Sequence, residues 1–163
     1  MAHLSQAQLQ TLKTYINSVP ELAAYPNNSD GNYEIAKKLN LAANPDFYVW
    51  KTNVPIATIG ATFNAAELAA RSAADQSRLQ TIAQYLPQGV NPSLVDHRAF
   101  FDDIFSGTGG QNTRALLLAL WKRKATQFEK LYATGTGSLG SPANLVLEGE
   151  VNYNHVEEAR NLP

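Results

Sequence analysis

The chain contains no cysteine among its 163 residues, and it has no long hydrophobic run. Without cysteine, neither a disulfide framework nor a zinc site with thiolate ligands can form, and the composition fits a reducing compartment without requiring one. The longest purely apolar run is ALLLALW, residues 115–121, whereas a helix that spans a bilayer needs about 20 apolar residues. The first residues, MAHLSQAQLQ, also lack the basic and apolar segments of a secretion signal. We expect a soluble protein that is not exported and has no membrane partner.

An excess of charge of either sign is missing as well. The 13 basic and 14 acidic residues give a net charge of −1, so no global field attracts the molecule to nucleic acid or anionic lipid. Charge is nevertheless uneven along the chain. Between residues 114 and 130 one acidic residue, Glu129, accompanies five basic ones: Arg114, Lys122, Arg123, Lys124 and Lys130. Residues 148–160 have the opposite bias, with Glu148, Glu150, Glu157 and Glu158 against Arg160.

Hydrophobic periodicity predicts a series of helices in a chain long enough for one domain with a substantial core. The first helix is well marked, because Ser5 and Gln8 form a capping box and Leu9, Leu12 and Ile16 lie on one face. Further helices are predicted over 20–25, over 32–41, as one turn over 56–59 before Gly60, from the cap Asn64 to Leu86, and from the cap Asn91, with Pro92 in first position, to Gly107. Residues 48–52 are predicted to be extended, because aromatic and β-branched residues stand between two prolines.

The last third of the chain is predicted to consist of a long helix and an arm. Arg114 to Ala133 should form the central helix, since its first half is apolar nearly all round. Thr134 to Ser141 contains only Gly, Thr, Ser and one Leu, a composition typical of a flexible linker. Residues 145–151 alternate like a two-faced strand, and Asn154 with Glu157 should cap a last helical turn.

We therefore predict a mainly α fold: a compact helical body over residues 1–133 and a C-terminal extended arm over residues 134–163. The arm should carry a short β-strand or hairpin and should be ordered mainly by contact with other chains, because its composition buries little surface.

No pattern indicates a catalytic, metal-binding or cofactor site. GTGSLGS, residues 135–141, follows a predicted helix, precedes a predicted strand and lacks the lysine of a phosphate-binding loop. The three histidines lie on separate segments, and only His155 with Glu158 has a helical spacing, which is common for a surface pair. Asp102 and Asp103 would point about 100° apart on a helix, so a hydrolase that uses them remains a remote alternative.

The cluster WKRK, residues 121–124, is the one basic and aromatic motif, and two interpretations remain open. The cations Lys122, Arg123 and Lys124 and the adjacent indole could grip nucleic acid, but they lack a wider basic surface. The alternative is that these cations face acidic groups, within the fold or across an interface.

Four segments together resemble a family of small proteins encoded among the head and tail structural genes of tailed bacteriophages and prophages. These segments are PNNSDG (26–31), NPDFYVWKTNV (44–54), FDDIFSGTGG (101–110) and KRKATQFEKLYATGTGSLGSPANLVLEGEV (122–151). The likeness extends over nearly the whole chain and is least marked between Pro55 and Gln88. No active site is attached to this family.

The resemblance implies a non-enzymatic virion protein, assembled in the host cytoplasm, at the head-to-tail junction. As a connector or adaptor it would form a ring with copies of itself and contact the portal protein and neck or tail proteins, with only incidental contact with packaged DNA. Strand addition and charge attraction between subunits lead us to expect this interface: Lys122, Arg123, Lys124, Leu145, Leu147, Glu148, Glu150 and Val151. A tail-completion protein, a head-decoration protein and a DNA-binding packaging accessory remain alternatives.

Overall fold

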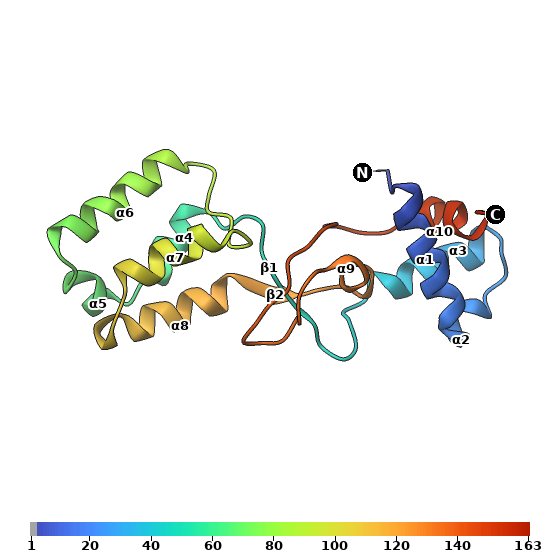
Figure 1. The fold of residues 1–163 in the computed structure, drawn as a ribbon, viewed down its shortest axis with the longest axis horizontal. Helices are drawn as coiled ribbons and strands as arrows, with labels where there is room; N and C mark the ends of the chain where they lie inside the picture. Colours follow the sequence, from blue (N-terminus) through green and yellow to red (C-terminus); the bar gives the residue numbers. More distant parts are fainter. Residues whose placement is uncertain (1–2) are drawn as a thin grey trace. The chain divides into compact units, whose positions relative to one another are not determined.

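The computed structural model describes residues 3–163 and confirms the mainly α class. The described chain folds into two compact units, each with its own hydrophobic core (Figure 1). Unit 1 consists of residues 3–48 and 124–163, and unit 2 of residues 49–123. This division differs from the predicted body of 1–133 and arm of 134–163. None of the helices described in residues 3–163 is both long and apolar enough to cross a bilayer.

The two strands of the structure lie where the chain passes from one unit to the other. β1 (Tyr48–Trp50) pairs with β2 (Lys122–Lys124). The Lys51 N–H donates to the Trp121 carbonyl, and the Ala125 N–H donates to the Phe47 carbonyl, both at 2.8 Å. The predicted extended segment at 48–52 is therefore confirmed in part by β1.

The predicted helix from Arg114 to Ala133 is wrong, because it is two helices separated by β2. α8 (Gln111–Leu120) ends before the strand, and α9 (Gln127–Tyr132) starts after it. Pairing with β1 takes the backbone groups that a continuous helix would have bonded internally, so tertiary context overrides local helix propensity here. The Thr126 hydroxyl and the Glu129 carboxylate then form the capping box that starts α9.

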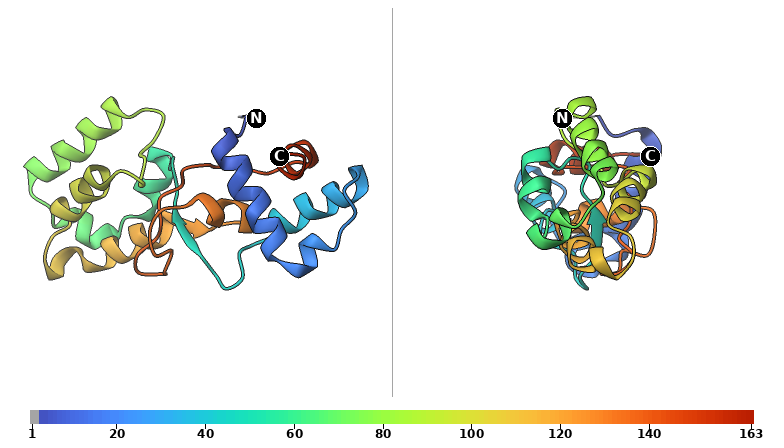
Figure 2. Two further views of the ribbon diagram at one scale, coloured as in Figure 1. Left: turned by 45° about the vertical axis from the view of Figure 1, so that its right-hand side comes forward. Right: turned by 90° about the vertical axis from the view of Figure 1, so that its left-hand side faces the viewer.

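Unit 1 contains the N-terminal helices and the C-terminal helix. α1 (Gln6–Ser18) begins with the predicted capping box: the Gln8 N–H donates to the Ser5 hydroxyl, and the Ser5 N–H donates to the Gln8 side chain. Two short helices follow, α2 (Pro20–Ala23) and α3 (Ser29–Leu39). α10 (Tyr153–Arg160) packs against α1 and α3, as the red and blue helices in Figure 2 show.

The core of unit 1 shows why the segment after residue 134 is not a free arm. Val151, Val156 and Ala159 are buried together with residues of α1 and α3: Leu9, Leu12, Ile16, Ile35, Ala36 and Leu39. Residues from both ends of the chain thus share one hydrophobic core. The expectation that the segment is ordered mainly by other chains is wrong, since burial of its apolar side chains against its own chain orders it.

Polar contacts hold the same segment in place. The Asn40 amide donates to the Val151 carbonyl at 2.8 Å and accepts from the Val151 N–H at 3.0 Å. Glu129 accepts from the Gly149 N–H at 3.2 Å, and the Lys13 ammonium donates to the Leu162 carbonyl at 2.6 Å. Side chains thus bind the Gly149 N–H and both backbone groups of Val151, and the strand predicted over 145–151 is absent.

A single antiparallel bridge is what remains of the predicted hairpin. Thr134 and Asn144 exchange two backbone hydrogen bonds, of 2.8 and 2.9 Å, and the chain turns between them. The last helix is also capped differently from the prediction. Asn152 accepts from the His155 N–H, so the cap of α10 lies two residues before the predicted cap at Asn154.

Unit 2 consists of short helices around an aromatic core. Its helices are α4 (Ile56–Thr62), α5 (Ala65–Ala69), α6 (Ala73–Tyr85), α7 (Val95–Ile104), the 3-10 turn η1 (Thr108–Gly110) and α8. Phe101 packs edge-on against Phe100 and Trp121, with ring centroids 5.2 and 5.6 Å apart. Val54 and Val90 close the unit with a two-bond backbone bridge.

Three predicted boundaries in unit 2 are corrected. The turn expected over 56–59 extends past Gly60 to Thr62. The helix expected from Asn64 to Leu86 is interrupted, because the Ser72 hydroxyl accepts from the Asp75 N–H and starts a new helix. Asn91 does not cap α7: its side chain accepts from the Ser93 N–H at 2.9 Å and closes a turn, so the helix begins at Val95.

Candidate functional site

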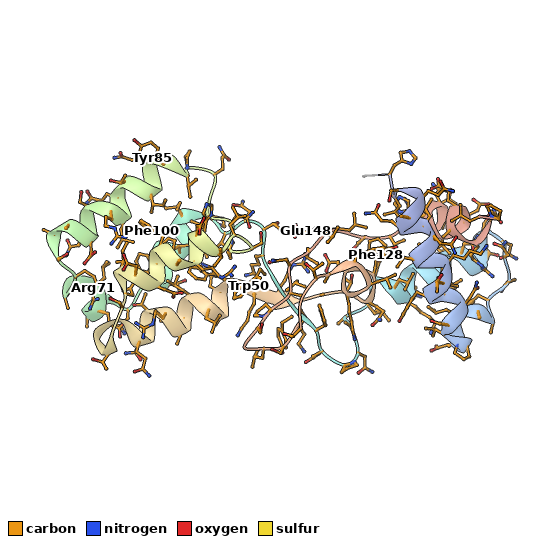
Figure 3. The ribbon with its side chains drawn as sticks, viewed as in Figure 1. Trp50, Arg71, Tyr85, Phe100, Phe128 and Glu148 are labelled. Atoms are coloured by element: carbon orange, nitrogen blue, oxygen red, sulfur yellow. The ribbon has the colours of Figure 1, made fainter. Side chains whose placement is uncertain are left out.

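Unit 2 has an open cavity of about 520 Å³ whose walls combine aromatic rings with charged groups. Its lining comes from β1, α7, α8 and the residues next to them: Trp50, Arg98, Asp102, Ser106, Gly107, Arg114, Ala115, Leu118 and Trp121. Trp50 is labelled in Figure 3. The volume falls in the range typical of ligand sites, which is about 300–1,000 Å³.

Arg98 lies against an aromatic face of this cavity. Its guanidinium carbon is 4.1 Å from the centroid of the Trp50 ring, and the guanidinium donates to the Pro92 carbonyl. Burial lowers the pKa of Arg98, while the charge of Asp102, one helical turn away, acts in the opposite direction. An arginine stays protonated in proteins, so Arg98 brings a fixed, partly desolvated positive charge to the cavity.

Arg114 brings a second positive charge, from α8. Its guanidinium donates to the carbonyls of Phe105 and Gly107, the latter at 2.8 Å. Throughout residues 3–163, no carboxylate lies within 4.0 Å of the nitrogens of Arg98 or Arg114, the distance that defines an ion pair. Both guanidinium groups are therefore oriented by backbone carbonyls, which leave their charge uncompensated at short range.

Trp121 combines a buried ring with an unsatisfied polar atom. Its side chain is 2% exposed, and its indole N–H has no hydrogen-bond acceptor within the described part of the chain. A buried donor without an acceptor costs about 1–3 kcal/mol. Trp50 and Trp121 are the two tryptophans of the sequence, so the intrinsic tryptophan fluorescence of the protein comes from the lining of this cavity.

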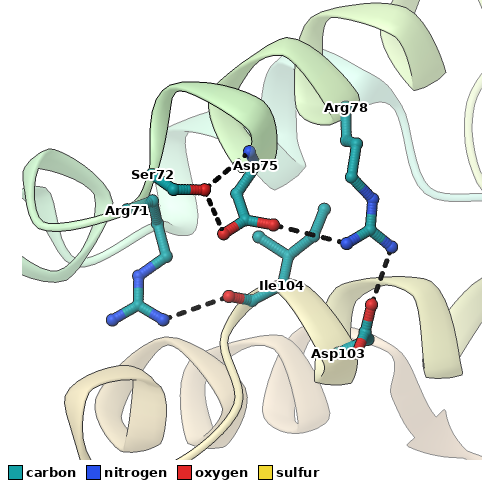
Figure 4. Close-up of polar contacts among 6 residues, drawn as sticks. All are labelled: Arg71, Ser72, Asp75, Arg78, Asp103 and Ile104. Carbon is teal, nitrogen blue, oxygen red and sulfur yellow. Dashed lines mark hydrogen bonds and ion pairs between the residues drawn. The ribbon is translucent and has the colours of Figure 1, made fainter.

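The carboxylates of the adjacent residues Asp102 and Asp103 lie in different environments. Asp102 lines the cavity, whereas Asp103 accepts from Arg78 at 2.8 Å (Figure 4). Arg78 also contacts Asp75 of its own helix at 3.3 Å, and its pair with Asp103 ties α6 to α7. The two aspartates thus share no common geometry, as their adjacency on a helix predicted.

A neighbouring arginine fastens the start of α6 rather than the cavity. The Arg71 guanidinium donates to the carbonyls of Ile104 (Figure 4) and Gly109, at 3.1 and 2.8 Å. These bonds cross-link the segment before α6 to the end of α7 and the η1 turn. The polar contacts in Figure 4 therefore have a structural role.

Unit 1 has a second surface hollow, a groove of about 390 Å³ beside α3 and the start of α10. Three large side chains in its lining are exposed: Tyr33 (59%), Leu41 (60%) and Tyr153 (44%). Lys37 and Glu150 also line the groove. This hollow joins an apolar rim to groups of both charges, a combination typical of a contact surface for another macromolecule.

The eight side chains expected at an interface lie in different environments. Lys122, Arg123 and Lys124 belong to β2, and Lys124 pairs with Asp46 at 2.8 Å. A strand places neighbouring side chains on opposite faces, so these three cations do not form one basic surface.

The remaining candidates divide between core and surface. Val151 is buried in the core of unit 1, and Leu147 packs against that core. Leu145 is half-buried, whereas Glu148 and Glu150 are exposed. The surface of this segment is therefore acidic, and its apolar face is used mainly within the unit.

The rings of His97 and His155 accept backbone hydrogen bonds. The His97 ring accepts from the Asn91 N–H at 3.1 Å, and the His155 ring accepts from the Asn152 N–H at 3.4 Å. His155 is 7% exposed, which differs from the surface pair predicted with Glu158. In residues 3–163, no three His, Asp or Glu side chains cluster as metal ligands.

Sequence reasoning missed the cavity of unit 2 because its charged and aromatic residues lie far apart in the chain. Trp50, Arg98, Arg114 and Trp121 share no spacing motif, and the fold alone brings them together. Two guanidinium groups in the lining of one cavity favour an anion such as a carboxylate. Comparisons with protein-family models, curated proteins and solved structures find no match to the chain.

Proposed function

We propose that the protein is a non-enzymatic structural protein of a tailed-bacteriophage virion and that it forms a ring at the junction between head and tail. The segments that resemble phage structural proteins support this proposal because they are distributed over both units. Residues 26–31 lie at the start of α3 in unit 1, and residues 101–110 connect α7 to η1 in unit 2. Residues 44–54 and 122–151 contain β1 and β2, where the chain passes between the units.

The observation that carries the proposal is the exposed apolar rim of the groove in unit 1. Single exposed hydrophobic residues are normal, but Tyr33, Leu41 and Tyr153 line one groove. Unit 2 offers a different surface, the cavity with two uncompensated arginines. A subunit that presents two unlike surfaces can bind its neighbours head to tail, the contact from which closed rings are built. The portal protein and neck or tail proteins would be the other partners.

The location of the protein in the virion tests this proposal. In a phage that encodes the chain, we expect a symmetric reconstruction of the virion to show it as a ring between the portal and the tail. Density on the capsid surface would favour a head-decoration protein, and density at the end of the tail would favour a tail-completion protein. Absence from the virion would refute a structural role.

A matched pair of variants tests the groove itself. Leu41→Asp places a charge in the apolar rim, whereas Leu94→Asp does so at an exposed position of unit 2 that lines neither hollow. Both variants should fold, because both side chains are about half exposed or more. We expect Leu41→Asp to yield tailless heads and Leu94→Asp to yield normal virions. Normal virions from both variants would show that the groove makes no essential contact.

A further inference from the structure

The charged side chains that line the cavity of unit 2 favour a bound anion. Arg98 and Arg114 come from α7 and α8, and each is held by backbone carbonyls rather than by a carboxylate. Asp102, the one acidic residue in the lining, lies one helical turn from Arg98. The two positive charges exceed this negative charge by one. A bound carboxylate would balance the charges of the site.

The chain itself carries an exposed group of matching chemistry in unit 1. This group lies in the acidic segment, residues 146–153. Four side chains of the acidic segment are exposed: Val146, Glu148, Glu150 and Tyr153. Gly149 lies between the two glutamates with a φ of 118°, in the left-handed region, and its N–H is bound by Glu129. The backbone that presents Glu150 is therefore fixed by its own unit, which reduces the entropy lost on binding.

We propose that the unit 2 cavity of one copy binds the acidic segment of a second copy, with the Glu150 carboxylate accepting from Arg98 and Arg114. This inference rests on the proposed ring, for which it supplies the contact between neighbours. Ala115 and Leu118 in the cavity lining give an apolar surface for Val146 or Tyr153. Because each copy has one cavity and one acidic segment, the contact is heterologous and can propagate around a ring.

A nucleic acid strand is the competing occupant, because arginines and tryptophans also bind phosphates and bases. Asp102 disfavours it, since this carboxylate would face a polyanion, whereas it can accept from the backbone N–H groups of a peptide. The near-neutral net charge of −1 supplies no wider attraction for phosphates either. The observations therefore favour a protein segment with a single carboxylate in the cavity.

Full-length chains can test the contact without assembly of a ring, because both tryptophans belong to unit 2. The acceptor is the Glu150→Lys chain, which keeps both tryptophans and has no Glu150 of its own. The donor is the Trp50→Phe, Trp121→Phe chain, which is free of tryptophan and leaves unit 1 unaltered. Addition of donor to acceptor should change the tryptophan emission of the acceptor in a saturable way.

Matched donors identify the residue responsible. Glu150→Lys in the donor should weaken binding by at least about 30-fold, the minimum expected when a desolvated charge pair loses one partner. Glu157→Lys makes the same charge change at an exposed position of α10 that lines neither hollow, and it should leave binding unchanged. Circular dichroism of each donor checks that its helix content matches that of the native chain.

Two results would overturn the inference: an emission change that is equal for the native and Glu150→Lys donors, or no change with any donor. A stronger response to a single-stranded oligonucleotide than to the native donor would assign the cavity to nucleic acid instead. The ring itself is judged separately by the virion reconstruction. A ring at the neck with no donor binding would refute this contact alone, whereas donor binding without the protein at the neck would refute the proposed location alone.

Discussion

The Glu67 carboxylate accepts a hydrogen bond of 2.7 Å from the backbone N–H of Thr113, 46 residues further along the chain. It also accepts from the Asn112 N–H at 3.0 Å. These donors belong to the first turn of α8, so a buried carboxylate from α5 caps the N-terminus of α8, where the positive end of the helix dipole favours it. The contact connects two helices of unit 2 that are distant in sequence.

This cap should make the stability of unit 2 sensitive to acid. Burial raises the pKa of the Glu67 carboxyl, but the hydrogen bonds from Thr113 and Asn112 outweigh burial and hold the pKa below its ordinary value of 4.5. A carboxyl with a lowered folded-state pKa contributes stability that is complete above the unfolded-state pKa and is lost as the pH falls through the folded-state pKa. We expect the melting temperature, followed by tryptophan fluorescence, to fall when the pH drops below 4.5.

Glu67→Gln should lower the melting temperature at neutral pH and flatten this acid dependence, because the amide lacks one acceptor and does not titrate. Glu157→Gln, at an exposed carboxyl outside unit 2, is the control. An unchanged acid dependence in Glu67→Gln would contradict the assignment.

His155 should make unit 1 sensitive to milder acid. Burial lowers the pKa of His155 from 6.5, His3 acts in the same direction and Glu158 opposes them. The neutral form is favoured in the folded chain, so stability is complete above pH 6.5 and falls as the pH drops below it, since the unfolded chain binds the proton more strongly. Protonation also removes the ring lone pair that accepts from the Asn152 N–H.

We expect His155→Gln to keep the cap and lose the pH dependence, because glutamine at this helical position can also accept from the cap residue. Thermal unfolding of unit 1, followed by circular dichroism between pH 7.5 and 5.5, measures the effect. His97→Gln changes a histidine of unit 2 and should leave this transition alone. Parallel losses of stability in wild type and His155→Gln would rule out His155 as the source.

Asn40 should secure the C-terminal segment to unit 1. Asn40→Ala removes both hydrogen bonds to Val151 and should destabilise unit 1 by about 1–3 kcal/mol for the backbone groups left unsatisfied. Urea denaturation measures the loss, and limited proteolysis should show faster cleavage after residue 145. Asn154→Ala, at an exposed position, is the control. Equal cleavage rates in all three chains would mean that Asn40 does not hold the segment.

Two glycines of the loop after α9 should respond differently to alanine. Gly137 has a φ of 64°, and a Cβ there would lie 2.1 Å from the Phe47 ring, whereas a Cβ at Gly140 would meet no atom within 4 Å. Gly137→Ala should cost about 1–3 kcal/mol or more from backbone strain and overlap. Gly140→Ala should change stability by less than about 1 kcal/mol. Similar midpoints of urea denaturation for the two variants would indicate that the loop does not pack on Phe47.

Sequence patterns predicted the elements that local contacts decide. The capping box of Ser5 and Gln8 and the stripe of Leu9, Leu12 and Ile16 lie within a few residues of one another, so the start and the buried face of α1 could be recognised. Interruptions of a helix that are caused by distant residues could not be recognised from the sequence. Residues 114–133 have the composition of one helix, and only the pairing of β2 with β1 interrupts it.

Much of the candidate site was beyond sequence reasoning for the same reason. Glu150 was selected because the tail is acidic, and the structure places it on an exposed groove. Arg98 and Trp50 gave no signal, since a cation above an aromatic ring arises from residues 48 positions apart that nothing local connects. Val151 was expected on a surface because it alternates with glutamates, but it is buried in the core of unit 1.

The insertion of unit 2 within unit 1 has a consequence for synthesis on the ribosome. α10 supplies Val156 and Ala159 to a core that α1 and α3 cannot complete by themselves. By the time this helix emerges, every residue of unit 2 has already been translated, because unit 2 ends at residue 123. The apolar faces of α1 and α3 therefore stay exposed until α10 has been synthesised, and we expect chaperones to bind nascent unit 1 during this interval.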